Sequence, residues 1–231
     1  MADDQPAAAE DDRHGHRARL RGRLLADAEG LLNHEIIEYL LMLVIRRVDT
    51  KPIAKALLRE FGGIGGLLTA DGKALARVPG MGEQSAAAIK IAQAAAIRLL
   101  RAQVADQPVI GNWQALLDYL HAEMAHHVVE RFRVLHLNTR MMLIRDEVMD
   151  EGTIDNTTVH VREVIRRCLE LGSAAIVLVH NHPSGNPGPS KADIDITRAL
   201  HDTAARLGIA LHDHLIIGTR GHVSLKAQGL F

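Results

Sequence analysis

The chain has 231 residues, 47% of them apolar, which is enough for one large domain or two small ones with a buried core. Its single cysteine, Cys168, excludes an internal disulfide framework and a cysteine-type zinc finger, so any metal must be held mainly by His, Asp or Glu. The net charge of -1 conceals a basic segment, residues 13–104, with 15 Lys+Arg against 8 Asp+Glu. Such a segment is a candidate surface for a polyanion.

The chain begins with the acidic stretch MADDQPAAAEDD, which lacks the apolar core of a secretory signal. We therefore expect a cytoplasmic protein. The longest apolar run, residues 39–45, is far shorter than the roughly 20 residues that span a bilayer, so the sequence predicts no membrane span.

Breaks in the apolar pattern divide the chain into four parts. Residues 1–16 are rich in Ala, Asp and Glu without periodicity, which predicts a disordered tail. Residues 17–104 predict an all-helical domain with glycine-rich turns between helices near 35–45, 53–61 and 85–100. Pro108 and Gly111 indicate a linker at residues 105–111.

Residues 112–231 have a different pattern, in which apolar strands alternate with helices. We expect helices near 113–124, 161–171 and 190–207, and strands near 130–137, 141–149, 174–180, 209–217 and 222–226. The combination predicts a mixed α/β domain after the helical one.

A glycine turn, Val78-Pro-Gly-Met-Gly82, separates two helical runs in the first domain. Gly80 and Gly82 permit positive φ, and the N–H groups that begin the next helix, which also carries Lys90, point to where a phosphate could bind. The turn resembles a helix-hairpin-helix motif, which implies contacts to the DNA backbone at these three residues without sequence readout. The alternative is a turn that only lets two helices pack.

Residues 179–193, VHNHPSGNPGPSKAD, follow a predicted buried strand. Side chains alternate along a strand, so we expect His180 and His182 to share a face and form half of a tetrahedral zinc site; the alternative is an exposed histidine-rich loop that binds no metal. Prolines and glycines stiffen the loop that follows, and Ser190 then has the position of a helix N-cap. Asp193 is either the partner of Ser190 in a capping box or a third metal ligand.

The same stretch fits the signature H-x-H-P, six residues, S-x-x-D of the JAMM (MPN+, JAB) metalloprotease superfamily. Together with LHDHLIIG and VSLKAQG further on, and with the helix-hairpin-helix domain, it resembles the bacterial RadC-like branch. The resemblance implies a JAMM/MPN (cytidine deaminase-like) α/β domain with a mixed sheet. It departs from many relatives at Asn138, where we expect Asp, and Asn181 stands where eukaryotic relatives usually have Ser or Thr.

The resemblance implies that His180, His182 and Asp193 bind Zn²⁺. It assigns Ser190 to stabilisation of the substrate carbonyl and Glu130 to general acid/base catalysis on a metal-activated water. Several residues are kept as less favoured candidates. The alternatives for the base are Glu123, Glu147 and Glu163, while Asp213 and His214 are expected in the core or in support of the ligands, and His212 outside the primary ligands.

Three functions follow as hypotheses. The first is a zinc-dependent hydrolase that cleaves a peptide or isopeptide amide and associates with DNA through its helical domain. The second is a non-enzymatic accessory protein for DNA binding and repair. The third is a metal-dependent nuclease, although the letters H-N-H at 180–182 are not the HNH nuclease motif, whose residues are spread along a ββα finger.

Overall fold

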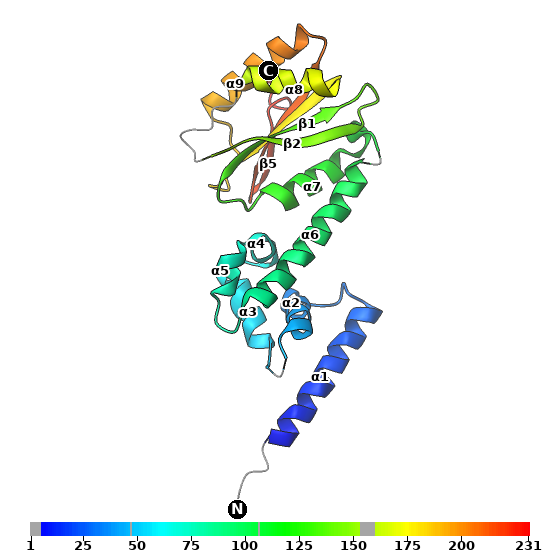
Figure 1. Cartoon of the computed structure of the whole chain (residues 1–231), viewed down its shortest axis with the longest axis vertical. Helices are drawn as coiled ribbons and strands as arrows, with labels where there is room; N and C mark the ends of the chain where they lie inside the picture. Colours follow the sequence, from blue (N-terminus) through cyan, green and yellow to red (C-terminus); the bar gives the residue numbers. More distant parts are fainter. Residues whose placement is uncertain (1–5, 47, 106, 153–159) are drawn as a thin grey trace, which may run out of the picture. The chain divides into compact units, whose positions relative to one another are not determined.

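The computed structural model describes residues 6–46, 48–105, 107–152 and 160–231, with side chains from residue 15 onward (Figure 1). The chain divides into two compact units, Met1–Ala95 and Ala96–Phe231. The first is helical and the second is a mixed α/β domain, as the sequence predicts at this level. In the described part of the chain, no helix combines the length and the apolar character that a membrane crossing needs.

The first unit is built from helices that enclose a small apolar core. Its helices are α1 Pro6–Ala26, α2 Asn33–Val44, α3 Lys51–Glu60, α4 Ile64–Thr69, α5 Gly72–Ala76 and the first part of α6 Glu83–Ala105. The main core contains Ile37, Leu41, Ile53, Ala54, Leu57, Leu67, Leu75, Ala86 and Ile89.

Helix α1 begins at Pro6, inside the segment that the sequence assigned to a disordered tail. Two physical reasons account for this difference. Alanine and glutamate have high intrinsic helix propensity, which the absence of an apolar period obscures. Farther along the same helix, Leu20 packs in a cluster with Leu31 and Met42, which ties α1 to α2.

Glycine turns precede α4 and α6 and let the chain reverse sharply. Gly62 and Gly63 have positive φ before α4, and Gly80 has φ +86° before α6. The N–H of Gly82 donates to the hydroxyl of Ser85 at 2.8 Å, and this hydroxyl donates back to the Gly82 carbonyl at 3.0 Å. The second turn is therefore fixed by its own hydrogen bonds as well as by its glycines.

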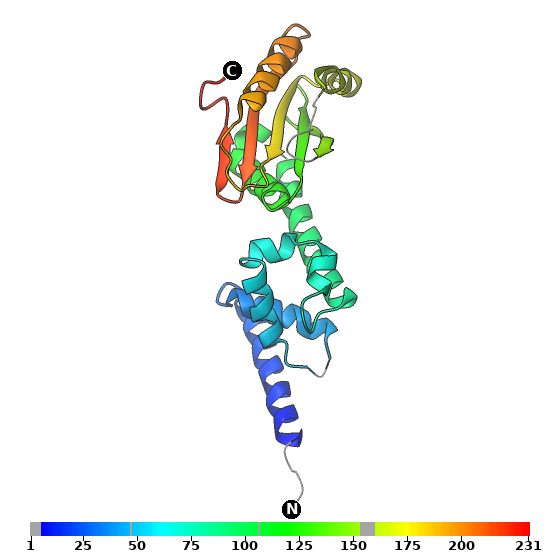
Figure 2. The same cartoon turned by 90° about the vertical axis from the view of Figure 1, so that its left-hand side faces the viewer.

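The second unit contains one five-stranded sheet with the order β2-β1-β3-β4-β5, whose neighbouring strands can be followed in Figure 2. Only β3 and β4 are parallel; the other neighbours are antiparallel. The strands are β1 Glu130–Leu137, β2 Leu143–Gly152, β3 Ala175–Asn181, β4 Ala210–Gly218 and β5 Gly221–Ser224. The helices are α7 Trp113–Met124, α8 Val161–Leu171 and α9 Lys191–Ala205, preceded by the 3-10 turn η1 Val109–Asn112.

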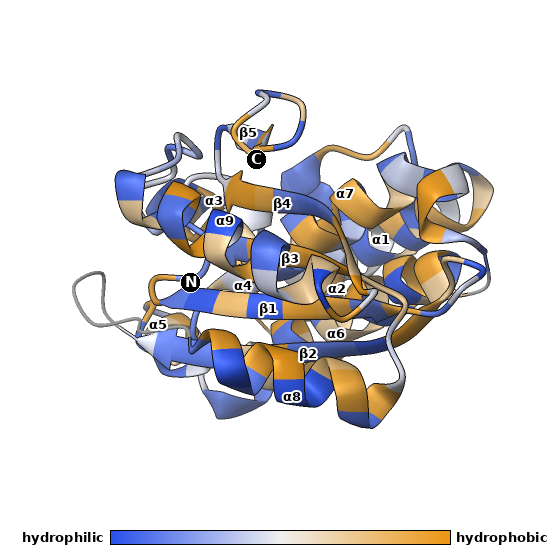
Figure 3. Cartoon of the chain, turned by 90° about the horizontal axis from the view of Figure 1, so that it is seen from above, coloured by the Kyte–Doolittle hydropathy of each residue, from blue (hydrophilic) through white to orange (hydrophobic). Residues whose placement is uncertain are grey.

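Helices cover both faces of this sheet, because its central strands carry apolar residues on both sides. On one face, α7 packs against alternate residues such as Leu135 and Val177. On the other face, α8 and α9 pack against Val134, Ile176 and Leu178 (Figure 1). Helix α8 alternates hydrophobic and hydrophilic residues, as its banding in Figure 3 shows, so that only one side enters the core.

Two segments differ from the sequence prediction near the start of this unit. The predicted linker contains η1, where Val109 is buried and its N–H donates to the Met141 carbonyl at 2.8 Å. Strand β2 begins at Leu143 because Asn138 forms a turn before it. The Asn138 carboxamide oxygen accepts from the N–H groups of Arg140 and Met142, at 2.8 and 3.1 Å.

The strand pairing brings three chain segments to one edge of the sheet. The parallel partners β3 and β4 end at this edge, with Asn181 paired to Ile217. Strand β1 runs the other way and begins there, with Phe132 paired to His180. The loop after β3 leads directly into the first turn of α9. Residues at the start of β1, at the end of β3 and at the start of α9 are thus placed close together.

We expect Gly80→Ala to lower the free energy of unfolding by about 2–4 kcal/mol, through positive φ and overpacking together. A Cβ at this position would lie 2.7 Å from Cδ1 of the buried Ile53. Gly62→Ala is the control, because φ there is +71° but a Cβ would meet nothing within 4 Å. Denaturant unfolding of both variants would measure the difference, and equal destabilisation of the two would contradict the role assigned to Ile53.

Candidate metal centre

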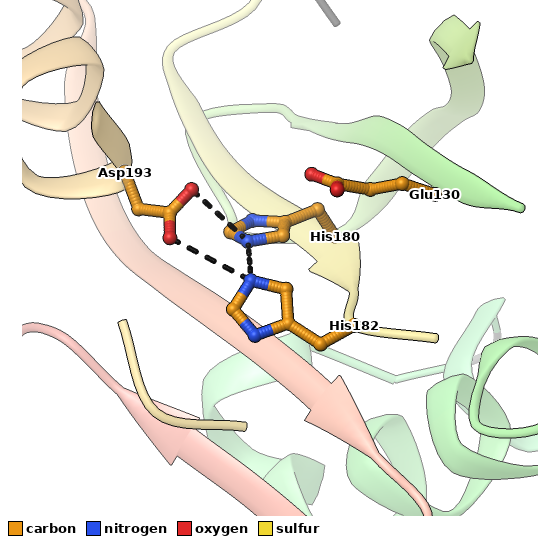
Figure 4. A group of neighbouring side chains, drawn as sticks. All are labelled: Glu130, His180, His182 and Asp193. Atoms are coloured by element: carbon orange, nitrogen blue, oxygen red, sulfur yellow. Dashed lines mark hydrogen bonds and ion pairs between the residues drawn. The ribbon is translucent and has the colours of Figure 1, made fainter. Parts of the chain in front are cut away.

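His180 and His182, the histidines of the first H-x-H stretch, point to the same face of the sheet at the edge where β3 ends. His180 is the penultimate residue of β3, and the N–H of His182 donates to the Ile217 carbonyl at 2.9 Å, which continues the pairing with β4 past the strand end. The extended backbone therefore reaches His182, and the Nε2 atoms of His180 and His182 lie 3.0 Å apart (Figure 4). The alternation predicted from the sequence is present.

The ring of His182 is held by the loop that follows it. Its Nδ1 lies 2.9 Å from the Asn186 carbonyl, an acceptor only, so this nitrogen carries the proton and Nε2 is left with a lone pair. The loop itself packs tightly against the turn after β4. Gly185 has φ +79°, and a Cβ there would lie 2.4 Å from Oγ1 of Thr219. The main chain at Gly185 therefore lies against Thr219, which restricts the loop that joins His182 to α9.

Asp193 is part of a capping box and also points at the histidines. Its Oδ2 accepts from the N–H and the hydroxyl of Ser190, both at 2.7 Å, while its own N–H donates to the Ser190 oxygen at 3.2 Å. Its Oδ1 lies 3.2 Å from Nε2 of His180, and Oδ2 lies 3.6 Å from Nε2 of His182. The two interpretations of Asp193 are thus compatible in one side-chain position.

The charge on Asp193 is stabilised by these neighbours. Burial opposes ionisation, but the neighbouring imidazoles of His180 and His182 and the hydrogen bonds from Ser190 hold the pKa of Asp193 far below its usual range. Conversely, the nearby carboxylate of Asp193 raises the pKa of His182. Asp193 is therefore a carboxylate at neutral pH, as a metal ligand must be.

Glu130, the first residue of β1, completes the group from the opposite side of His180 (Figure 4). Burial raises its pKa, and the carboxylate of Asp193 acts in the same direction, while His180 and His182 lower it. Ligand atoms of Glu130, His180, His182 and Asp193 all lie within 4.8 Å of one another. Such a carboxylate, partly buried and shifted toward neutral pH, is suited to hold and release a proton.

Asn181 fixes the main chain on both sides of Glu130. Its side-chain oxygen accepts from the N–H of Arg131 at 2.9 Å, and its side-chain nitrogen donates to the Val129 carbonyl at 3.1 Å. A longer contact, 3.4 Å, joins the same nitrogen to the His127 carbonyl. The residue between the two histidines is fully buried and acts as a clamp that holds Glu130 beside them.

The donor set fits zinc in chemistry and in spacing. Imidazole nitrogen and carboxylate oxygen are common zinc ligands, and ligands about 2.0–2.2 Å from a tetrahedral zinc lie about 3.3–3.6 Å from one another. The Nε2 atoms of His180 and His182 lie 3.0 Å apart, and the two carboxylate oxygens of Asp193 each lie near one of them, Oδ1 3.2 Å from His180 Nε2 and Oδ2 3.6 Å from His182 Nε2. These three residues can therefore occupy three corners of one tetrahedron with little movement.

The less favoured candidates lie elsewhere. The three other glutamates form ion pairs with arginines: Glu123 with Arg133, Glu147 with Arg167, and Glu163 with Arg166. Asp213 accepts from the main-chain N–H of His214 and Lys226 and from the Ser224 hydroxyl, which ties β4 to the segment after it. His212 makes an edge contact with Trp113 and is not in the group.

His214 and Thr197 are buried and contact two members of the group, His180 and Asp193, from the interior. His214 is buried, and its Nε2 lies 2.8 Å from Nδ1 of His180. Sequence reasoning placed His214 in the core or in support of the ligands but did not identify Thr197. The spacing in the sequence could have indicated Thr197, since it stands four residues after Asp193 and so lies on the same side of α9.

The predicted DNA-contacting residues are in the first unit. Lys90 is partly buried, and its ammonium donates to the carbonyls of Leu68 and Ala70, at 3.4 and 3.1 Å, where α4 ends. Burial lowers its pKa. Lys90 thus satisfies carbonyl groups within its own unit, while Gly80 and Gly82 form the turn before α6.

The second unit matches a known family. The model of the RadC-like JAB domain aligns with residues 110–230, which is just over half of the chain. The matched segment includes the whole sheet and all four residues of the metal-binding group. Family match and site geometry thus agree, and the chain belongs to the RadC-like JAB domain family.

Proposed function

We propose that the second unit is a zinc-dependent hydrolase of the JAMM type, which cleaves an amide bond in a peptide or isopeptide. The observation that carries this proposal is the convergence of Glu130, His180, His182 and Asp193, whose ligand atoms lie within 4.8 Å of one another. Membership of the RadC-like JAB domain family supports it, because the JAB fold is a metal-binding one.

In this proposal His180, His182 and Asp193 hold the zinc ion and leave a fourth position open. Zinc bound there would lower the pKa of a coordinated water to about 7 and polarise the carbonyl group of an amide. The loop anchored by Gly185 and the pairing of His182 with Ile217 keep the donors in place before any ion arrives. Such preorganisation reduces the cost of assembling the site.

Glu130 is the proposed proton carrier. Amide hydrolysis needs a group that accepts a proton from the attacking water and delivers it to the leaving nitrogen. The carboxylate of Glu130 is partly buried beside His180, and burial raises its pKa toward the range where both forms are accessible. The clamp formed by Asn181 holds the main chain on both sides of Glu130 at the end of β3.

Ser190 is the proposed donor to the substrate oxygen. Its hydroxyl is at the surface and donates to Oδ2 of Asp193 at 2.7 Å. Rotation about its Cα–Cβ bond would release this hydrogen bond and turn the O–H toward a carbonyl oxygen bound in the site. The N–H of Ser190 would still donate to Asp193, so that the capping of α9 is kept in part.

We expect one zinc ion per wild-type chain and a loss of at least 100-fold in zinc affinity in His182→Ala and Asp193→Ala, because each removes one of three protein ligands. Elemental analysis and competition with a chromophoric chelator would measure both quantities. His201→Ala is the control, since His201 lies on α9 outside the group. A wild type that binds no zinc at neutral pH would overturn the proposed site.

We expect Glu130→Gln to retain zinc and to lose amide hydrolysis by a factor of about 10²–10⁴, because the amide cannot carry the proton. The assay would use fluorogenic peptide and isopeptide libraries with zinc-loaded protein. Glu151→Gln is the matched control on β2, where Glu151 pairs with Arg131. Loss of zinc in Glu130→Gln would make Glu130 a ligand, and unchanged hydrolysis would remove it from the reaction.

We also propose that the helical unit is a helix-hairpin-helix module that binds the DNA backbone. Two glycine turns, one before α4 and one before α6, support this proposal, together with the basic surplus of residues 13–104. Because the ammonium of Lys90 donates to carbonyls of its own unit, the contacts are assigned to exposed cations beside the second turn, Lys73 and Arg77. The chain would then be a DNA-associated hydrolase or a DNA-binding accessory protein.

We expect the full chain to bind labelled duplex DNA with an affinity that falls as salt rises. The salt slope should decrease by about one in Lys73→Ala and in Arg77→Ala, because each variant removes one cation that would neutralise a phosphate. Arg206→Ala, an exposed site in the second unit, is the control. Fluorescence anisotropy would measure these affinities. Affinity without salt dependence would contradict the proposal, and cleavage of nicked or branched DNA with zinc or manganese would favour the nuclease alternative.

A further inference from the structure

A continuous row of hydrogen-bonding atoms joins two of the proposed metal ligands through the interior. Nδ1 of His180 lies 2.8 Å from Nε2 of His214, and Nδ1 of His214 lies 2.5 Å from the hydroxyl oxygen of Thr197. The Thr197 hydroxyl in turn donates to the main-chain carbonyl of Asp193. The row therefore starts at one ligand on β3, passes through β4, and ends at another ligand on α9.

The proton positions along this row follow from what each atom can do. The Asp193 carbonyl only accepts, so the Thr197 hydroxyl gives its proton there and its oxygen accepts from Nδ1–H of His214. A neutral imidazole has one N–H, so Nε2 of His214 has a lone pair and accepts from Nδ1–H of His180. Nε2 of His180, which faces His182 and Asp193, is then free of a proton.

Reversal of the donor and acceptor directions along this row would prevent Nε2 of His180 from binding a metal. If His214 donated from Nε2, then Nδ1 of His180 would have to accept, and the single proton of the His180 ring would be on Nε2. That nitrogen could no longer coordinate a metal. His214, Thr197 and the inner side of His180 are all buried, so water is not available to satisfy an N–H that has lost its partner.

We propose that His214 and Thr197 are positioning residues that hold His180 in the tautomer with Nε2 free to bind metal, and that they thereby set the affinity of the site. This inference rests on the proposed metal centre. It assigns a function to the second H-x-H stretch, since His214 supports a ligand from behind without being one. It also explains why a hydroxyl residue stands at position 197, one helical turn after Asp193.

The test compares zinc affinities measured by chelator competition in the full chain. Thr197→Val removes the hydroxyl at nearly constant volume and should weaken zinc binding by about 10–100-fold, whereas Thr197→Ser keeps the hydroxyl and should restore affinity to within about threefold. Thr203→Val is the matched control. Thr203 lies on the same helix, and its hydroxyl also donates four residues back, to the Ala199 carbonyl at 2.7 Å.

A second measurement needs no variant. Long-range ¹H–¹⁵N NMR of the zinc-loaded wild type should show His180 and His214 both protonated at Nδ1; a proton at Nε2 of His214 would overturn the inference. If the wild type takes up no zinc, the proposed metal centre fails, and this inference fails with it. If the wild type binds zinc and Thr197→Val binds it equally well, only this inference fails.

Discussion

The pairing of β3 with β1 on one side and with β4 on the other places Glu130, His180 and His214 in the proposed centre. Because β1 is antiparallel to β3, its first residues lie beside the last residues of β3, and Glu130 comes next to His180. Because β4 is parallel to β3, the ends of both strands share an edge, and His214 contacts His180 from behind. Main-chain hydrogen bonds within the sheet thus determine the positions of Glu130, His180 and His214.

Asp193 shows how one side chain serves both the fold and the proposed chemistry. Its Oδ2 satisfies the N–H that opens α9, while Oδ1 is directed at His180. The same helix dipole that favours a carboxylate at this position also keeps it charged for a metal. The two acceptor oxygens of a carboxylate let one side chain do both, which gives a physical reason for an aspartate at the third position after Ser190.

Much of this arrangement could be predicted from local pattern. The buried strand before His180, the alternation that pairs it with His182, and the N-cap at Ser190 are all properties of short segments, and the structure has each of them. Glu130 lies about 50 residues away in sequence and was found only through the family resemblance. No local pattern encodes a contact between β1 and β3.

Other features depend on packing that a single sequence does not display. Thr197 resembles any threonine on an amphipathic helix until β4 brings His214 to its hydroxyl. The ammonium of Lys90 donates to carbonyls of its own unit because α4 ends beside α6, a fact of tertiary structure. The start of α1 at Pro6 was not predicted because this alanine-rich segment has high helix propensity but no apolar period.

The Asn181 clamp has a consequence for the alignment of the sheet. A slip of β1 by one residue against β3 would turn Glu130 to the opposite face, because side chains alternate with a period of two. Main-chain bonds alone tolerate such slips, since every residue offers the same N–H and carbonyl. In the observed alignment the Asn181 side chain adds two hydrogen bonds to those of the ladder, from the N–H of Arg131 and to the carbonyl of Val129. The residue between the histidines thus adds side-chain hydrogen bonds to the alignment of β1 in which the Glu130 carboxylate lies beside the imidazoles.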